Sequence, residues 1–342
     1  MNRVARSALL LAVAGAAWGA PGAPGAMAQP PALRYVSFNI LHGGALSGWR
    51  GNGEDLEARL AIAVDELRRL DPDVIGIQEA SVTRRRGNVA ERLGRELGFH
   101  YVFSPALFQI FRFALINRQV SGLMNFQEGP AILSRFPLVE WEPHELPRCH
   151  GFFDPRVLVY ARVRTPWGDL GVASAHTSQG FCEAERVIEL LQSRRGALPL
   201  VLMGDFNARE ESPAIRRVVA AGLVDAFRAA NPTDPGRTTW QGVHAQASTV
   251  FARIDYVFVL PGYQVPGRVL SSRVVLNAPR RFRDGAALWP SDHYGVLAEL
   301  DVFGAGATAT TRATGSGGGE GAGTPAGAPP SPEPGEPGPA DR

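Results

Sequence analysis

Short apolar runs, each followed by polar residues, recur along the chain from about residue 34 to residue 302. The first two are Arg34–Ile40 and Val74–Glu79, and an amide or a carboxylate lies at or near the end of each. Runs of this length are typical of buried or half-buried strands. Between them, apolar residues recur every three or four positions, which predicts an amphipathic helix over Asp55–Leu70.

The same patterns predict the other elements. Further helices are expected over Val89–Leu97, Cys182–Arg194 and Ser212–Ala221; in the last, Ser212 is the expected N-cap and Pro213 the first helical residue. Further strands are expected over Tyr101–Phe103, Glu128–Arg135, Val157–Arg164, Asp169–Ala175, Leu200–Asn207, Ala252–Val259 and Val296–Val302. Because strands alternate with helices but several are joined as hairpins, we expect an α/β fold with mixed sheets.

The run Leu200–Asn207 carries the most informative polar residues. Strand alternation sends Asp205 and Asn207 to the same side, while Phe206 packs the other way. A carboxylate and a carboxamide at the mouth of a buried strand suit the holding and polarising of a water molecule. A strand that merely ends in turn-forming residues is the alternative.

Composition divides the chain of 342 residues into three parts. Residues 1–28 have a basic start, a short apolar run and a final Ala-Met-Ala, which together predict a signal peptide and a secreted or periplasmic protein. A membrane anchor is the less favoured alternative, because a span needs ~20 apolar residues. Residues 29–302 are expected to form one domain, and residues 303–342, rich in Gly, Ala and Pro, a disordered tail.

The formal net charge of +2 indicates no particular partner. The segment 106–126 holds many apolar residues and two arginines that do not keep to one helix face. Core packing explains it most simply, and a peripheral contact with a lipid surface is the sharper alternative. We expect a monomer.

The chain has two cysteines, Cys149 and Cys182. If Arg164 pairs with Asp169 in the expected hairpin, the cysteines lie nearly opposite each other at its open end. In an oxidising compartment this favours a disulfide, and two free thiols are the alternative.

Polar residues recur where the expected strands end or begin. They are Asn39, Glu79, His176, Asp205, Asn207, Asp255, Asp292 and His293. Carboxylates at a sheet rim need a partner, and a hard divalent cation is the simplest one. An oxygen-rich set without thiolates suits Mg²⁺, or Mn²⁺, better than Zn²⁺. An isolated histidine such as His42 is expected to be structural or solvated.

Seven short motifs occur in a particular order. They are Ser37-Phe38-Asn39, Ile77-Gln78-Glu79, Ile132-Leu133-Ser134-Arg135, Ser174-Ala175-His176-Thr177, Gly204-Asp205-Phe206-Asn207, Arg253-Ile254-Asp255-Tyr256 and Ser291-Asp292-His293. In types and order they resemble the endonuclease/exonuclease/phosphatase superfamily, which includes pancreatic deoxyribonuclease. The resemblance implies a four-layer α/β/β/α sandwich, with two mixed β-sheets face to face and helices outside. It also implies Mg²⁺-dependent hydrolysis of phosphodiester bonds.

The resemblance also assigns residues to the metal and the phosphate. It makes Glu79 the main metal ligand, with Asn39 and Asp292 completing the metal and phosphate site. Arg156 matches a phosphate-contacting arginine. Glu128 lies where the family's deoxyribonucleases place a carboxylate that supports the first catalytic histidine.

The remaining roles concern proton transfer and charge. By the resemblance, Asp205 activates the attacking water and Asn207 holds a phosphate oxygen. His293 is paired with Asp255, and His176 contacts the phosphate from the other side. Both imidazoles are expected to be positively charged, as suits the charge that builds up during hydrolysis.

Two features of the chain bear on the substrate. Deoxyribonuclease has a DNA-contacting arginine where this chain has Ser81, whereas secreted bacterial sphingomyelinases also bracket this hairpin with a disulfide. Together with the apolar segment 106–126, this favours a phospholipid or another small phosphodiester as the substrate, and a nucleic acid is the alternative. A non-catalytic binding module that has kept the fold is the least favoured alternative.

Overall fold

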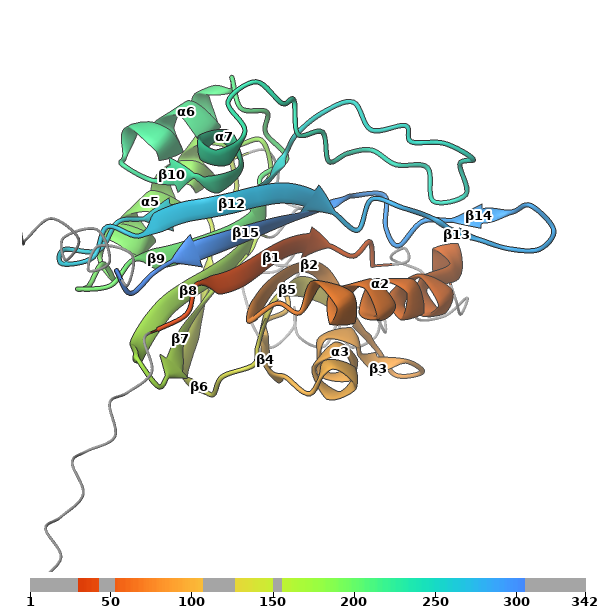
Figure 1. The fold of residues 1–342 in the computed structure, drawn as a ribbon, viewed down its shortest axis with the longest axis horizontal. Coiled ribbons are helices and arrows are strands. Elements are labelled where there is room, and N and C mark those ends of the chain that lie inside the picture. Colours follow the sequence, from red (N-terminus) through yellow and green to blue (C-terminus); the bar gives the residue numbers. More distant parts are fainter. Residues whose placement is uncertain (1–29, 43–52, 107–126, 150–155, 305–342) are drawn as a thin grey trace, which may run out of the picture. The chain divides into compact units, whose positions relative to one another are not determined.

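A computed structural model describes residues 30–42, 53–106, 127–149 and 156–304. Its larger sheet has seven strands in the order β12-β15-β1-β2-β5-β4, with β3 beside β2 (Figure 1). These strands are β1 (Leu33–Asn39), β2 (Val74–Thr83), β3 (Gly87–Asn88), β4 (His100–Phe103), β5 (Gln127–Ser134), β12 (Arg268–Val275) and β15 (Gly295–Asp301). Since β1 and β2 are parallel and their neighbours pair antiparallel, the sheet is mixed.

The second sheet has six strands in the order β10-β11-β9-β8-β7-β6. They are β6 (Leu138–Glu145), β7 (Val157–Thr165), β8 (Gly168–His176), β9 (Leu200–Asp205), β10 (Val224–Asp225) and β11 (Asp255–Leu260). Only β8 and β9 are parallel among these pairs, so this sheet is mixed as well. Strands β13 (Arg280–Arg281) and β14 (Ala287–Leu288) form a separate small hairpin.

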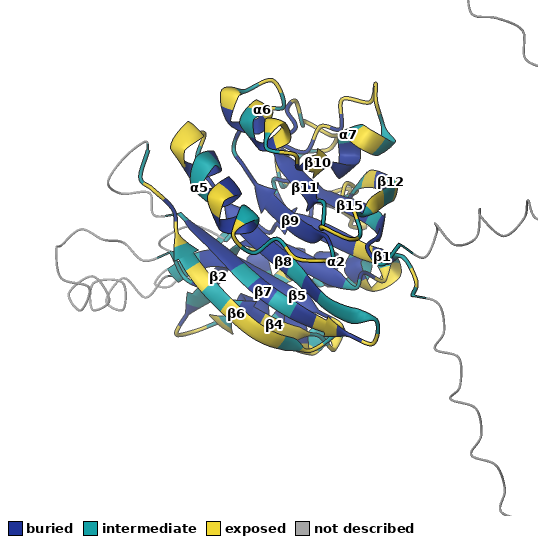
Figure 2. Cartoon of the chain, turned by 90° about the vertical axis from the view of Figure 1, so that its left-hand side faces the viewer, coloured by how far each residue is buried: buried dark blue, intermediate teal, exposed yellow. Residues whose placement is uncertain are grey.

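Helices cover the outer face of each sheet. The short helix η1 (Gly53–Asp55) leads into α2 (Leu56–Leu70), which with α3 (Val89–Leu97) packs on the seven-stranded sheet. On the other sheet lie α5 (Phe181–Gln192) and α6 (Pro213–Ala220), while the short α7 (Ala226–Ala230) contacts β11 and β12. A third apolar cluster fills the space between the sheets, and buried residues dominate the strands in Figure 2. The expected four-layer sandwich is confirmed.

The two sheets approach closely where their parallel strand pairs face each other. A Cβ atom on Gly76 of β2 would lie 2.5 Å from the Cβ of Met203 on β9, so only glycine fits there. This contact brings the ends of β1 and β2 against the ends of β8 and β9. The polar residues at these four strand ends consequently meet across the sandwich.

Several local predictions agree with the structure. Arg164 lies opposite Asp169 in the β7–β8 hairpin, and Cys149 and Cys182 form a disulfide with their Cα atoms 6.1 Å apart. Ser212 caps α6 by accepting a hydrogen bond from the Ile215 N–H at 3.2 Å. Strands β6 and β12 were not predicted, because β6 is an exposed edge strand and β12 mixes polar with apolar residues, so neither has an apolar run.

Three predictions concern segments outside the described residues. They are the signal peptide over 1–28, the lipid-contacting segment 106–126 (of which only Ala106 is described) and the tail over 303–342 (described only to residue 304). All three remain predictions. Within the part of the chain that the structure describes, no helix is long and apolar enough to cross a membrane.

Candidate active site

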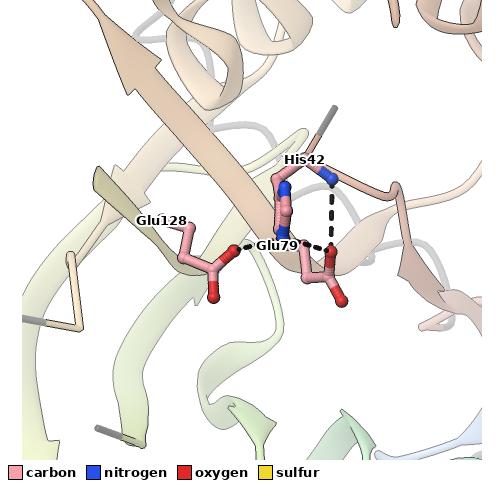
Figure 3. A group of neighbouring side chains, drawn as sticks. All are labelled: His42, Glu79 and Glu128. Carbon is pink, nitrogen blue, oxygen red and sulfur yellow. Dashed lines mark hydrogen bonds and ion pairs between the residues drawn. The ribbon is translucent and has the colours of Figure 1, made fainter. Parts of the chain in front are cut away.

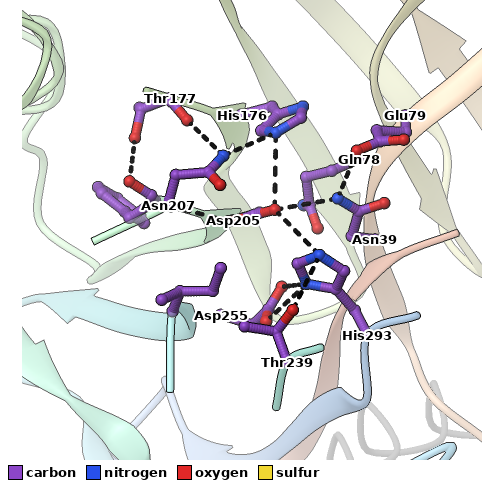
Figure 4. A network of polar contacts seen from close by, with 12 residues as sticks. Asn39, Gln78, Glu79, His176, Thr177, Asp205, Asn207, Thr239, Asp255 and His293 are labelled. Carbon is purple, nitrogen blue, oxygen red and sulfur yellow. Dashed lines mark hydrogen bonds and ion pairs between the residues drawn. The ribbon is translucent and has the colours of Figure 1, made fainter. Parts of the chain in front are cut away.

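The candidate catalytic residues lie in a row across neighbouring strands. In the six-stranded sheet, His176 at the end of β8 pairs with Asp205 at the end of β9, which pairs with Asp255 at the start of β11. Side chains of directly paired residues project from the same face of a sheet. The three side chains therefore point together toward the ends of β1 and β2 in the other sheet (Figure 4).

Asp205 lies at the centre of this polar network and is 1% exposed. Its Oδ2 accepts a hydrogen bond from Asn39 Nδ2 at 3.0 Å and lies 3.5 Å from Nε2 of His176. The same oxygen lies 3.8 Å from Nε2 of His293. Its Oδ1 accepts the Asn207 N–H at 2.8 Å. One carboxylate thus contacts residues from both sheets.

The charge of Asp205 is controlled by its surroundings. Burial, together with the neighbouring Asp255 carboxylate, raises the pKa of Asp205 to about 7. A carboxylate with a pKa in this range can accept a proton from water near neutral pH and is basic enough to assist its attack.

His293 is held in one orientation by Asp255. Its Nδ1 lies 3.0 Å and 3.2 Å from the two oxygens of Asp255, and its Nε2 lies 3.3 Å from Oγ1 of Thr239. Burial alone would lower its pKa, but the carboxylates of Asp255 and Asp205 raise it well above its ordinary value. His293 therefore carries a positive charge at neutral pH, as expected, and Nε2 faces Asp205. Thr239 was not singled out from the sequence.

His176 differs from the expectation. Burial, followed by the charge of Arg156, lowers the pKa of His176 well below its ordinary value. The expected imidazolium is therefore wrong for the protein without substrate, in which this ring is neutral. The Nδ2 of Asn207 lies 3.1 Å from Nε2 of His176 and donates to the carbonyl of Thr177 at 2.9 Å.

Two of these side chains depend on unusual backbone angles. Asn207 has φ 49°, so it is placed by a left-handed turn after β9 and not by the strand alternation inferred from the sequence. Glu79 has φ 58° and lies where the register between β2 and β5 shifts. Such bulges redirect a side chain, and left-handed non-glycine residues cost about 1–3 kcal/mol. Both deviations occur at predicted functional residues.

Glu79 is surrounded by hydrogen-bond donors. Its Oε1 accepts from Asn39 Nδ2 at 2.9 Å, the same nitrogen that donates to Asp205. Burial would raise its pKa, but the imidazolium of His293, the hydrogen bond from the Asn39 amide and, when they are protonated, the rings of His176 and His42 lower it. Glu79 is therefore ionised at neutral pH. One amide nitrogen, that of Asn39, donates to both Glu79 and Asp205.

His42 also joins this part of the site, although it was expected to be structural or solvated. Its ring Nε2 lies 3.5 Å from the Glu79 carboxylate and 3.0 Å from that of Glu128 (Figure 3). The backbone N–H of His42 also donates to Glu79, at 3.2 Å. Potential ligand atoms of these three residues all lie within 4.8 Å of one another. Glu128, predicted to support His176, thus forms its ion pair with His42. The sequence offers one weak signal for His42, which is that it follows Asn39 by three residues.

Arg59 was also missed, because a charged residue in an amphipathic helix was taken to be solvated, although Arg59 follows the buried Leu56 by three positions. Its side chain is fully buried. It donates to the carbonyls of Ile40 at 2.7 Å, Leu41 at 2.9 Å and Pro290 at 3.1 Å, and to that of Glu54 at 2.6 Å. Arg59 therefore ties the segment after β1 to the loop that carries Asp292 and His293.

The predicted metal ligands are compatible with a divalent cation. Asp292 is 26% exposed in its side chain, and its Oδ1 lies 4.0 Å from Nε2 of His293. Burial raises the pKa of Asp292, and the negative charge of Glu79 adds to this effect. Two carboxylates that repel each other in a half-buried place are stabilised by a shared cation. In residue type Glu79, Asp292 and Asn39 suit a divalent cation, and potential ligand atoms of Glu79 lie within 4.8 Å of those of His42 and Glu128.

The comparisons with known proteins agree with this geometry. The family model described as "Endonuclease/Exonuclease/phosphatase family" matches residues 36–293. The chain belongs to this family. Its members are metal-dependent phosphoesterases and nucleases, so the protein is a hydrolase of phosphoric ester bonds. A search of curated proteins found no match to the sequence.

Solved structures share the fold at low sequence identity. A mannosyl-6-phosphatase of Bacteroides thetaiotaomicron has a TM-score of 0.60 and 21% identity, over 79% of this chain and 99% of that one. The human Nocturnin catalytic domain with bound sulfate has a TM-score of 0.56 and 20% identity, over 79% and 93%. Truncated TDP2 of Caenorhabditis elegans has a TM-score of 0.54 and 17% identity, over 79% and 97%. At these identities the likeness establishes the fold.

Proposed function

We propose that this protein is a secreted, Mg²⁺-dependent phosphodiesterase in which Asp205 activates the attacking water. The observation that carries this proposal is the environment of Asp205. Its buried carboxylate, with a pKa of about 7, lies between two imidazoles and is linked through Asn39 to the ionised Glu79. A base, a cationic group and oxygen ligands for a metal are thereby brought together.

The proposed roles follow from these contacts. Glu79, Asn39 and Asp292 would hold the cation, which when bound supplies positive charge to the phosphate oxygens. Asp205 accepts the proton of the attacking water. Hydrolysis then depends on where the remaining charges and donors lie.

His293 and the residues around His176 act on the phosphate. Asp255 holds the imidazolium of His293 so that Nε2 can donate to the oxygen on which negative charge builds up. Neutral His176, Asn207 and Arg156 supply further contacts from the opposite side. These assignments keep the roles inferred from the sequence for His293, Asn207 and Arg156, with the charge of His176 revised.

Hydrolysis of bis(p-nitrophenyl) phosphate tests the reaction. The mature protein is expected to release p-nitrophenol with Mg²⁺ or Mn²⁺ and to lose this activity in EDTA. Asp205→Asn should abolish most of it, whereas Asp234→Asn, at an exposed turn, serves as the matched control. Hydrolysis that persists in EDTA would refute the metal-dependent mechanism.

Export is tested separately. Expression of the full chain in a bacterial host, followed by mass spectrometry of the exported protein, should give a form that begins at Gln29, because the predicted cleavage follows Ala28. Retention of residues 1–28 in a membrane fraction would instead support the anchor alternative.

A further inference from the structure

A cavity of about 460 Å³ opens beside the candidate active site. Asn207 and Thr239, which contact His176 and His293 respectively, are among the residues that line it. Its outer wall includes Trp240, Phe251 and Arg209. The cavity is therefore continuous with the place where the phosphate would be held, and the proposed chemistry gives no role to Trp240, Phe251 or Arg209.

Two aromatic rings form the apolar part of this wall. Trp240 is 55% exposed and Phe251 is 51% exposed, and their ring centroids lie 5.7 Å apart at an interplanar angle of 65°. The backbone next to both rings is held by one residue, because Thr239 forms β-bridges with Ala252 and with His293. Because this pairing fixes the rings relative to His293, they present a pre-arranged aromatic surface at the active site.

Arg209 adds a positive charge to the same wall. Its guanidinium carbon lies 5.7 Å from the centroid of the Phe251 ring, and its side chain is exposed. Among the residues that the structure describes, no carboxylate forms an ion pair with Arg209, and no Asp or Glu lines the cavity. The cavity thus combines aromatic faces with a cation whose charge is not locally neutralised.

We propose that this cavity binds the organic group of the substrate, and that it selects a planar ring with a second negative charge. An aromatic wall stacks on flat rings, and an unneutralised arginine attracts a further anion. A choline-type cation would need an aromatic face free of positive charge or a nearby carboxylate, and Arg209 already lies over Phe251. This assignment rests on the proposed function, because it takes the phosphate to be held at Asp205 and Asn207.

Three small phosphates separate the possibilities in the presence of Mg²⁺. Thymidine 3′,5′-bisphosphate carries a ring and a second anion, phosphocholine carries a cation, and methyl phosphate carries neither. Each is measured as an inhibitor of bis(p-nitrophenyl) phosphate hydrolysis and, independently, by calorimetric titration of the full chain. The bisphosphate should bind at least about 10-fold more tightly than methyl phosphate, since stacking and charge both contribute. Phosphocholine should gain nothing over methyl phosphate.

Substitutions assign this preference to the wall. Trp240→Ala and Phe251→Ala should each reduce the affinity ratio of the bisphosphate to methyl phosphate several-fold, and Trp240→Phe should retain most of it. Arg209→Gln should remove the advantage of thymidine 3′,5′-bisphosphate over thymidine 5′-phosphate. Phe282→Ala and Arg216→Gln, which change an exposed aromatic residue and an exposed arginine outside the cavity lining, should leave both ratios unchanged.

The two proposals fail in different ways. Absence of hydrolysis together with selective, wall-dependent binding in calorimetry would overturn the proposed function but not the cavity assignment. Hydrolysis without any preference for the bisphosphate would overturn the cavity assignment alone. Tighter binding of phosphocholine than of methyl phosphate would overturn the cavity assignment as well. So would a preference for the bisphosphate that survives Trp240→Ala, Phe251→Ala and Arg209→Gln.

Discussion

Replacement of Arg59 by methionine removes the group that joins two loops of the active site. The methionine keeps much of the apolar stem but none of the five N–H donors. The carbonyls of Ile40 and Pro290, both in buried hydrogen bonds with this guanidinium, lose their donor. Those of Glu54 and Leu41 lie in partly buried bonds, where water can substitute.

The expected loss of stability follows from these contacts. A buried acceptor left without a donor costs about 1–3 kcal/mol, so two of them cost about 2–6 kcal/mol. Burial lowers the pKa of Arg59 to about 10, which means that the buried charge is itself unfavourable. Its removal offsets part of the loss, and we expect the free energy of unfolding to fall by about 2–4 kcal/mol. The free energy of unfolding of Arg59→Lys should lie between those of the wild type and Arg59→Met, because lysine keeps the charge but lacks the planar guanidinium.

Two measurements check this reasoning. Urea unfolding gives the change in the free energy of unfolding, with Arg69→Met on the exposed face of the same helix as the matched control. Hydrolysis of bis(p-nitrophenyl) phosphate should show kcat/KM at least about 10-fold lower for Arg59→Met, since small displacements of catalytic groups are costly. An Arg59→Met protein within about 1 kcal/mol of the wild type and fully active would refute the positioning role.

Three further predictions concern the catalytic base, an acid-sensitive ion pair and the disulfide. Asp205→Asn or His293→Ala should lower kcat at least about 10²-fold while the protein stays folded, and near-normal kcat in either would contradict its role. The hydrogen bond from Arg228, assisted by Arg253, lowers the pKa of Glu210 to about 2, below its ordinary 4.5. Its contribution to stability is therefore present above pH 4.5 and is lost as the pH falls toward 2. The difference in unfolding free energy between wild type and Glu210→Gln should accordingly shrink on acidification, and a constant difference would exclude this cause. Replacement of Cys149 and Cys182 by serine should lower the free energy of unfolding by about 2–4 kcal/mol. An unchanged free energy of unfolding would show that the disulfide is dispensable.

The residues that sequence reasoning missed share one property, which is that their partners are distant in the chain. Arg59 on a helix reads as a solvated charge, yet one of its acceptors is 231 positions away. His42 is one of several isolated histidines in the sequence, and only the fold places it between Glu79 and Glu128. The left-handed angle at Glu79 likewise depends on a register shift against β5. Helical spacing places Arg59 on the buried side of α2, but no local pattern indicates which distant carbonyl groups accept its hydrogen bonds.

The sequence alone determined the α/β class with mixed sheets, the hairpin register and the set of polar residues at the strand ends, because these depend on side-chain periodicity and on the order of neighbouring residues. The four layers were implied by the resemblance of its short motifs to a known family. Only the tertiary structure decided that His176 is neutral, that Glu128 pairs with His42, and that an aromatic wall with an arginine lies beside Asn207. The physical reason is that charge state and recognition depend on burial and on contacts between distant segments, both of which arise when the two sheets pack together.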